Sequence, residues 1–160
     1  YEKLLRRVEG RGVFTVVDAT RDLLVNVLKY HPFLIKPNNY ELGEIFGVTL
    51  STKEDVILYA KKLQEMGAAN VLVSMAGDGA VLVAEDGSTY KSEAPEGKVK
   101  NSVGAGDSMV AGFLYGYLKS GIYEDAFYYG VCTGSASAFS ENLATREEVD
   151  TLLRNIKNRA

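Results

Sequence analysis

Residues 100–113, which read KNSVGAGDSMVAGF, decide the fold of this chain. Apolar residues recur from Met109 onward with the i, i+4 spacing of a helix that buries one face. The small residues Gly104, Ala105 and Gly106 stand directly before that periodic run. A helix N-terminus leaves backbone N–H groups free at the positive end of the helix dipole. The stretch therefore predicts an anion site that suits a phosphate, or a phosphoryl group during transfer.

Asp107, in the first turn of the expected helix, allows two interpretations of this stretch. In the first, Asp107 caps the helix and the glycines form a tight loop. In the second, Asp107 is a general base that takes a proton from an attacking hydroxyl. A carboxylate beside an anion site repels the anion unless it has such a task, and the rest of the chain favours the second interpretation.

The composition is typical of a soluble globular protein. The chain has 160 residues, of which 46% are hydrophobic and 24% charged, which fits one domain or part of a larger one. A net charge of −3 and the lack of a long apolar run argue against nucleic acid and membrane as partners. Cys132 is the only cysteine, which indicates a reducing, cytoplasmic compartment. Because the chain starts at Tyr1 and soon enters a helix–strand unit, we expect a piece of a longer protein.

Alternating strand and helix patterns predict an α/β fold with a mostly parallel sheet. The expected early elements are a helix over 1–8, a strand over 13–17, a helix over 22–30 and a strand over 33–35. Their spacing is typical of a right-handed parallel strand–helix–strand unit. Further strands are expected over 71–73, 80–84 and 89–92. The short glycine loop between the first two of these predicts an antiparallel edge.

Three residue pairs have the spacing of a capping box, in which an N-cap side chain and an acid three residues later exchange hydrogen bonds with the backbone. The pairs are Asn38 with Glu41, Ser51 with Glu54, and Thr145 with Glu148. They predict helix starts at these positions.

The expected helix over 123–140 carries a small residue at every fourth position. These residues are Ala126, Gly130, Gly134 and Ala138. Such a stripe lets a helix pack closely against a neighbouring helix or against the flat ring of a ligand, and core packing is the favoured interpretation.

Two polar segments follow expected strands. Lys36 to Glu44 follows the second strand, and in open α/β sheets ligands bind beyond the carboxyl ends of strands. Residues 74–79, which read SMAGDG, follow the third strand. This loop is either a simple turn or a backbone that passes close to a phosphate.

Three stretches resemble the ribokinase/PfkB family of sugar kinases, in this order and spacing: Lys36–Glu41, Ser74–Ala80 and Asn101–Phe113. The last resembles the family's C-terminal signature, whose core is Gly-Ala-Gly-Asp. The resemblance implies a three-layer ribokinase-like (Rossmann-like) sandwich. Residues 1–160 would be its C-terminal nucleotide-binding and catalytic part, with the N-terminal half and the lid absent.

The resemblance also implies the chemistry, with ATP and Mg²⁺ as cofactors. Asp107 would accept the proton of the attacking sugar hydroxyl, and Gly104–Gly106 would form the anion hole. Glu41, with Asn38, would hold Mg²⁺ through water. The nucleotide would be bound by Lys36, Asn38, Ser74, Ala76, Gly77, Gly79, Gly104, Ala105 and Gly106. Adenine would lie near the helix over 123–140, with Cys132 and Ser135 as candidates.

The sugar phosphate implied by the resemblance is fructose 1-phosphate, with tagatose 6-phosphate or another sugar of the family as the alternative. Residues 16–20, 36–42 and 103–113 carry this preference. A homodimer is expected for the full-length protein.

The chain departs from the family pattern at two places. Asn101-Ser102 replaces the Asp-Thr common in the family, which puts a monovalent-cation site in doubt, and Ala76 replaces a common glycine. Residues 1–160 on their own are expected to bind ATP weakly and to show no catalytic turnover, because a sheet cut through its middle exposes an edge.

Two other classes of function remain as hypotheses. A nucleotide-sensing module could keep the sheet without the chemistry, but Asp107, Glu41 and Asn38 are all present. A dinucleotide-binding oxidoreductase is disfavoured, because no G-x-G-x-x-G follows the first expected strand.

Overall fold

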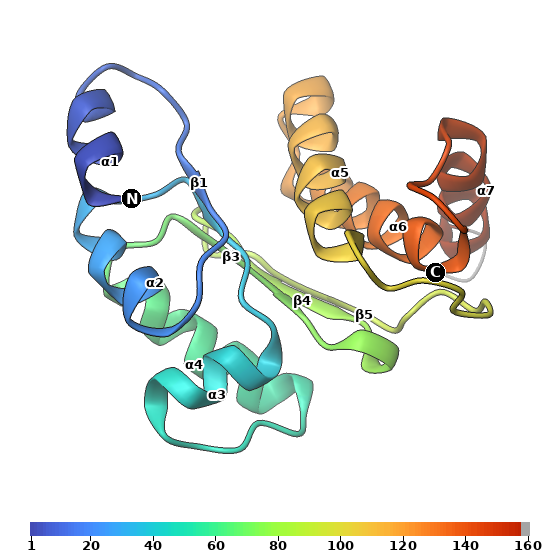
Figure 1. Ribbon diagram of the computed structural model, residues 1–160, viewed down its shortest axis with the longest axis horizontal. Coiled ribbons are helices and arrows are strands. Elements are labelled where there is room, and N and C mark those ends of the chain that lie inside the picture. Colours follow the sequence, from blue (N-terminus) through green and yellow to red (C-terminus); the bar gives the residue numbers. More distant parts are fainter. Residues whose placement is uncertain (158–160) are drawn as a thin grey trace. The chain divides into compact units, whose positions relative to one another are not determined.

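The computed structural model describes residues 1–157, and the chain divides into two compact units (Figure 1). The first unit comprises residues 1–75 and 80–91, and it contains almost all of the sheet. The second unit comprises residues 76–79 and the residues from 92 onward, and it is mainly helical.

The elements of the first unit alternate between helices and strands. They are α1 (Glu2–Val8), β1 (Val16–Val17), α2 (Arg21–Val27), the 3₁₀-helix η1 (Leu28–Tyr30), β2 (Leu34–Ile35), α3 (Asn39–Phe46), α4 (Lys53–Glu65), β3 (Asn70–Ser74), β4 (Ala80–Val83) and β5 (Thr89–Ser92). The elements of the second unit are the 3₁₀-helix η2 (Ala76–Asp78), α5 (Ala105–Ser120), α6 (Tyr123–Phe139) and α7 (Arg146–Lys157).

The strands form one five-stranded sheet in the order β1-β2-β3-β4-β5 (Figure 1). β1 and β2 are parallel, with Val17 opposite Ile35, and β2 and β3 are also parallel. β3 and β4 are antiparallel, with Ser74 opposite Ala80 across the short loop that joins them. The sheet is therefore mixed, which confirms the predicted α/β fold with an antiparallel edge.

The first strand is shorter than predicted. β1 covers only Val16–Val17, and the side chains of Val13 and Phe14 are each 57% exposed. The prediction of a buried strand over 13–17 is wrong for its first part. β1 lies at an edge of the sheet, so apolar residues beside it have no strand neighbour on one side. Phe14 packs against Phe33 instead, with ring centroids 4.3 Å apart.

The expected helix over 22–30 consists of two parts. α2 ends at Val27, and one 3₁₀ turn continues to Tyr30. His31 follows with a φ of +49°, a left-handed conformation that cannot continue a helix.

Helix α4 is capped one residue later than predicted. Its N-cap is Thr52, whose hydroxyl accepts a hydrogen bond from the Asp55 N–H at 3.1 Å. The Ser51–Glu54 capping box is therefore wrong, and Glu54 instead forms an ion pair with Lys91 at 2.9 Å. Ser51 and Thr52 each have an acid three residues later, so spacing alone favours neither of them.

The core of the first unit lies between the helices and the sheet. α4 packs on β3 and β4, where Val56, Ala60 and Leu63 are completely buried. β3 and β4 are buried along nearly their whole length. Close packing of this kind holds the ends of the strands in place, together with the polar residues that follow them.

The small-residue stripe of α6 packs against α5 in the second unit. A Cβ at Gly130 would lie 3.0 Å from the Met109 carbonyl oxygen, and one at Gly134 would lie 3.0 Å from the Ala105 carbonyl oxygen. The interpretation of the stripe as core packing is therefore confirmed, because the helix backbones approach too closely to admit a ligand ring. Within residues 1–157, no helix has both the length and the apolar character needed to cross a membrane.

Candidate functional site

The predicted site residues fall into two sets, one in each unit. The first unit contains Lys36, Asn38, Glu41 and Ser74. The second unit contains Ala76, Gly77, Gly79, Gly104, Ala105, Gly106 and Asp107.

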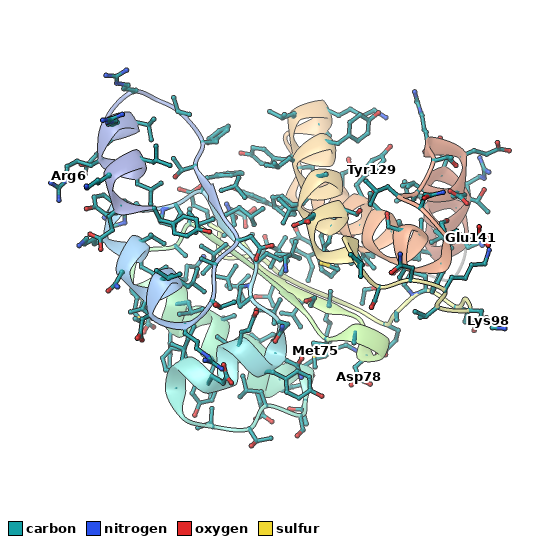
Figure 2. All side chains as sticks on the ribbon, viewed as in Figure 1. Arg6, Met75, Asp78, Lys98, Tyr129 and Glu141 are labelled. Carbon is teal, nitrogen blue, oxygen red and sulfur yellow. The ribbon has the colours of Figure 1, made fainter. Side chains whose placement is uncertain are left out.

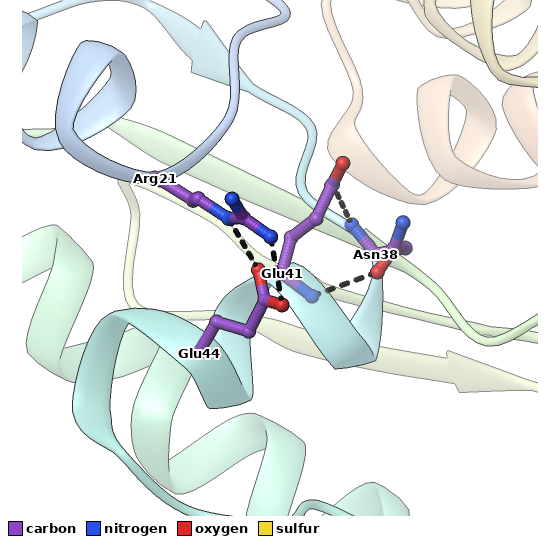
Figure 3. Close-up of polar contacts among 4 residues, drawn as sticks. All are labelled: Arg21, Asn38, Glu41 and Glu44. Carbon is purple, nitrogen blue, oxygen red and sulfur yellow. Dashed lines mark hydrogen bonds and ion pairs between the residues drawn. The ribbon is translucent and has the colours of Figure 1, made fainter.

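Asn38 and Glu41 form a complete capping box at the start of α3 (Figure 3). The Asn38 N–H donates to Glu41 Oε2 at 2.8 Å, and the Glu41 N–H donates to Asn38 Oδ1 at 2.8 Å. The sequence predicted this box, and it holds both side chains in fixed positions at the N-terminus of the helix.

The capping box limits what these residues offer to a metal ion. Glu41 Oε2 and Asn38 Oδ1 each accept one hydrogen bond, whereas Glu41 Oε1 has no partner among the described residues. Within residues 1–157 no cluster of three metal-binding side chains occurs. This donor set fits Mg²⁺, which keeps several waters and binds proteins through one or two carboxylates together with substrate phosphates.

Ser74 lies beside Asn38 at the carboxyl ends of neighbouring strands. The two residues form an isolated parallel β-bridge, and the Ser74 N–H donates to the Pro37 carbonyl at 3.2 Å. The parallel pairing of β2 with β3 therefore brings together two predicted site residues that are 36 positions apart in the sequence.

Lys36 is buried and paired with an acid, an arrangement that sequence reasoning missed. Its side chain is 8% exposed, and Nζ lies 3.5 Å from Asp18 Oδ2. Asp18 directly follows β1 and Lys36 directly follows β2, so the register that pairs Val17 with Ile35 sets them side by side. The available signal was that two opposite charges each terminate an apolar strand.

A second ion pair, between Arg21 and Glu44, links α2 to α3 (Figure 3). Arg21 Nε donates to Glu44 Oε2 at 2.9 Å and Nη2 donates to Oε1 at 3.2 Å, so the contact is bidentate. Hydrogen bonding and charge attraction from the guanidinium lower the pKa of Glu44. Arg21 has a φ of +50°, which is uncommon for a residue other than glycine. Sequence reasoning gave no indication of this contact.

The loop at residues 76–79 has left-handed backbone at both ends. Ala76 has a φ of +48° and Gly79 a φ of +92°. A side chain at Gly79 would collide with the Ser92 carbonyl, so glycine is required there. Asp78 is exposed within this turn (Figure 2).

The N-terminus of α5 is open. Its N-cap is Gly104, with a φ of +79°, and no side chain caps the helix. The Ala105 N–H donates to the Ser102 carbonyl at 3.2 Å. The N–H groups of Gly106 and Asp107 have no acceptor in the part of the chain that the structure describes. These two donors and the helix dipole together favour an anion.

The Asp107 carboxylate is exposed and accepts no hydrogen bond from any described residue. It therefore does not cap α5, and the capping interpretation is wrong for this residue. A carboxylate that is free of structural contacts at an anion-favouring helix end is available for proton transfer.

The two adenine candidates on α6 differ in accessibility. Cys132 is buried with Ala136, Val149 and Leu153, and this burial raises the pKa of its thiol to about 12. Ser135 is half-buried. Cys132 is therefore a core residue, and of the two only Ser135 is open to contact.

Known proteins match this chain over almost its whole length. A model of the pfkB family of carbohydrate kinases matches residues 5–150. The chain is 47% identical to 1-phosphofructokinase of Bacillus subtilis over 157 residues, which are 98% of this chain and 52% of the relative. It is 35% identical to D-tagatose-1-phosphate kinase of Bacillus licheniformis over 136 residues, 84% of this chain and 44% of the relative.

A solved structure agrees with the sequence relatives. Escherichia coli phosphofructokinase-2 in complex with substrates and products superposes with a TM-score of 0.87 at 26% identity, covering 98% of this chain and 52% of that one. The chain therefore belongs to the pfkB family of carbohydrate kinases. It spans about half the length of the curated relatives it matches.

Proposed function

We propose that this chain is the C-terminal nucleotide-binding and catalytic part of a kinase that transfers the γ-phosphate of ATP to a sugar phosphate. Fructose 1-phosphate is the proposed acceptor, which would give fructose 1,6-bisphosphate. Membership of the pfkB family and 47% identity to a 1-phosphofructokinase support this proposal. We further propose that the full-length protein has an N-terminal half and a lid in addition to this chain, and that it is cytoplasmic. We also propose that it forms a homodimer, which light scattering would detect.

The observation that carries the proposal is the open N-terminus of α5 with the free carboxylate of Asp107. The attacking sugar hydroxyl gives its proton to Asp107 as its oxygen bonds to the γ-phosphorus, and ADP leaves. The N–H groups of Gly106 and Asp107 donate to the charge that develops on the phosphoryl oxygens. One such donor typically contributes about 3 kcal/mol of barrier lowering.

The remaining residues hold the nucleotide in place. Lys36 and Ser74 are proposed to contact its phosphates, together with the backbone of residues 76–79. Mg²⁺, when bound, neutralises phosphate charge. Glu41 Oε1 is the oxygen left to hold the ion through water, and Asn38 positions Glu41 through the capping box.

A coupled assay of ADP formation on the full-length protein tests this function. The acceptors are fructose 1-phosphate, fructose 6-phosphate, tagatose 6-phosphate and tagatose 1-phosphate, each with Mg-ATP. We expect the highest kcat/KM with fructose 1-phosphate. The 35% identity to a D-tagatose-1-phosphate kinase makes tagatose 1-phosphate the second candidate.

Asp107→Asn tests the base, and Asp22→Asn is its matched control in the first turn of another helix. We expect the first variant to lose most of its activity and the second to lose none. Activity that survives Asp107→Asn would refute the role of the base. Inactivity of the full-length protein on all four sugars, with ATP still bound, would favour a nucleotide-sensing module. Residues 1–160 expressed alone are expected to show no turnover, and sustained activity from them would contradict the division proposed here.

A further inference from the structure

Asp18 and Lys36 form an ion pair at the carboxyl edge of the parallel part of the sheet. Each residue directly follows its strand, and the parallel register of β1 with β2 places them side by side. The Lys36 side chain is 8% exposed and the Asp18 side chain 39% exposed, with 3.5 Å between Nζ and Oδ2. The ammonium group is therefore enclosed by protein, and the carboxylate reaches solvent.

An enclosed ammonium group requires a partner, because burial of an unpaired charge is costly. Among the described residues, Asp18 is the acid that pairs with Lys36. A lysine ammonium has three N–H donors, and its contact with Asp18 at 3.5 Å is an ion pair. The pair therefore fixes the position of the Lys36 side chain and leaves donors for a second anion.

The stability of the fold alone gives little reason for this pair. Replacing a buried ion pair with apolar side chains often leaves the stability of a protein unchanged or raises it. The pair instead stands where ligands of open α/β sheets bind, and Lys36 lies two residues before the N-cap of α3.

We propose that Asp18 is a positioning residue that acts through Lys36: it holds the Lys36 ammonium group at the strand ends, where this group contacts the nucleotide phosphates. The inference rests on the proposed kinase function, since Lys36 is given its ligand there. Asp18 itself does not touch the reacting atoms in this arrangement.

A double-mutant cycle in the full-length protein tests the proposal. Asp18→Asn keeps the shape of the side chain and removes its charge, and Lys36→Met removes the ammonium group. We expect each single variant to lower kcat/KM for ATP by about tenfold or more, while KM for the sugar stays unchanged. If Asp18 acts through Lys36, adding Asp18→Asn to Lys36→Met lowers kcat/KM no further. Asp18→Glu keeps a carboxylate and is expected to restore part of the activity.

Two outcomes would overturn the proposal. Asp18→Asn could lower kcat/KM by the same factor with or without Lys36, which would mean that Asp18 acts on its own ligand. Alternatively, Asp18→Asn could leave kcat/KM at the wild-type value. Asp22→Asn, four residues along the chain, is the control for a change of charge in this region.

A chemical readout tests the arrangement without activity. Acetic anhydride labels accessible lysines, and mass spectrometry gives the labelled fraction at each position. We expect Asp18→Asn to raise labelling of Lys36 severalfold relative to Lys29, whose side chain is 60% exposed. Unchanged labelling of Lys36 would show that Asp18 does not hold it. If the wild-type protein phosphorylates no sugar, the proposed function fails, and the labelling still decides whether Asp18 positions Lys36.

Discussion

The N-termini of α3 and α5 carry an acid at the same position and use it in opposite ways. Glu41 and Asp107 are each the third residue of their helix. Glu41 closes a capping box with Asn38, so its carboxylate and its N–H both have partners. Asp107 follows an N-cap glycine, and its carboxylate and N–H have no partner among the described residues.

The N-cap residue accounts for this difference. The Asn38 side chain supplies the acceptor that the helix end needs, whereas Gly104 has no side chain to offer. A helix end that is satisfied by its own residues gains stability, and one that is left open can bind an anion. The comparison therefore separates an acid used for structure from an acid available for chemistry.

Substitution of the two acids themselves should separate the two helix ends most strongly. Asp107→Asn should lower kcat of the full-length protein by about 10²- to 10⁴-fold, because a general base is lost. Its melting temperature should change little, since the carboxylate makes no hydrogen bond and only its charge beside the helix dipole is lost. Glu41→Ala, in α3, removes the acceptor of the Asn38 N–H and should lower the melting temperature measurably. If calorimetry showed that both variants lower the melting temperature equally, the two acids would not differ in their structural role.

Gly104→Ala tests whether the open helix end depends on a left-handed residue. Gly104 has a φ of +79°, and its Cβ would lie 3.2 Å from Leu143 Cδ2. We expect a loss of about 1–2 kcal/mol in the free energy of unfolding, measured by urea denaturation. Gly121→Ala, at the other end of the helix with a φ of +70° and open space around it, separates strain from crowding. A larger loss at Gly121 would contradict the role of Leu143.

Asn38→Ala opens the end of α3 in the way that α5 is open. Loss of an N-cap side chain costs about 0.5–2 kcal/mol of unfolding free energy. Asn38→Ser should recover most of this loss in the same urea titration, because serine also supplies an acceptor. A variant Asn38→Ala as stable as wild type would show that the capping box contributes nothing.

The smallest effect is expected at α7, which is closed in the same way as α3. The Thr145 N–H donates to Glu148 Oε2 at 2.7 Å, and this bond is the main cause of a lowered pKa of Glu148. A lowered pKa in the folded state stabilises the protein above the usual value of about 4.5, and this stabilisation is lost as the pH falls further.

We therefore expect the difference in melting temperature between wild type and Glu148→Gln to be largest near pH 7 and to shrink below pH 4.5. A difference that stays constant from pH 7 to pH 3 would show that the charge of Glu148 has no part in capping.

The local features of this molecule were predictable from sequence. The capping boxes at Asn38 and Thr145 depend on residues three positions apart, and the small residues of α6 recur at every fourth position. The Ser51 cap failed because two overlapping patterns compete there, and spacing alone does not choose between them.

Hydrophobic periodicity and turn residues act over short distances, and they were enough to predict the α/β class, the antiparallel edge and the glycine-flanked helix that carries Asp107. The folded arrangement, by contrast, buries Lys36 against Asp18 and pairs Arg21 with Glu44. It also left Val13 and Phe14 exposed beside an edge strand. Such contacts depend on which strands and helices become neighbours and in what register, and that choice is made by the packing of the whole chain.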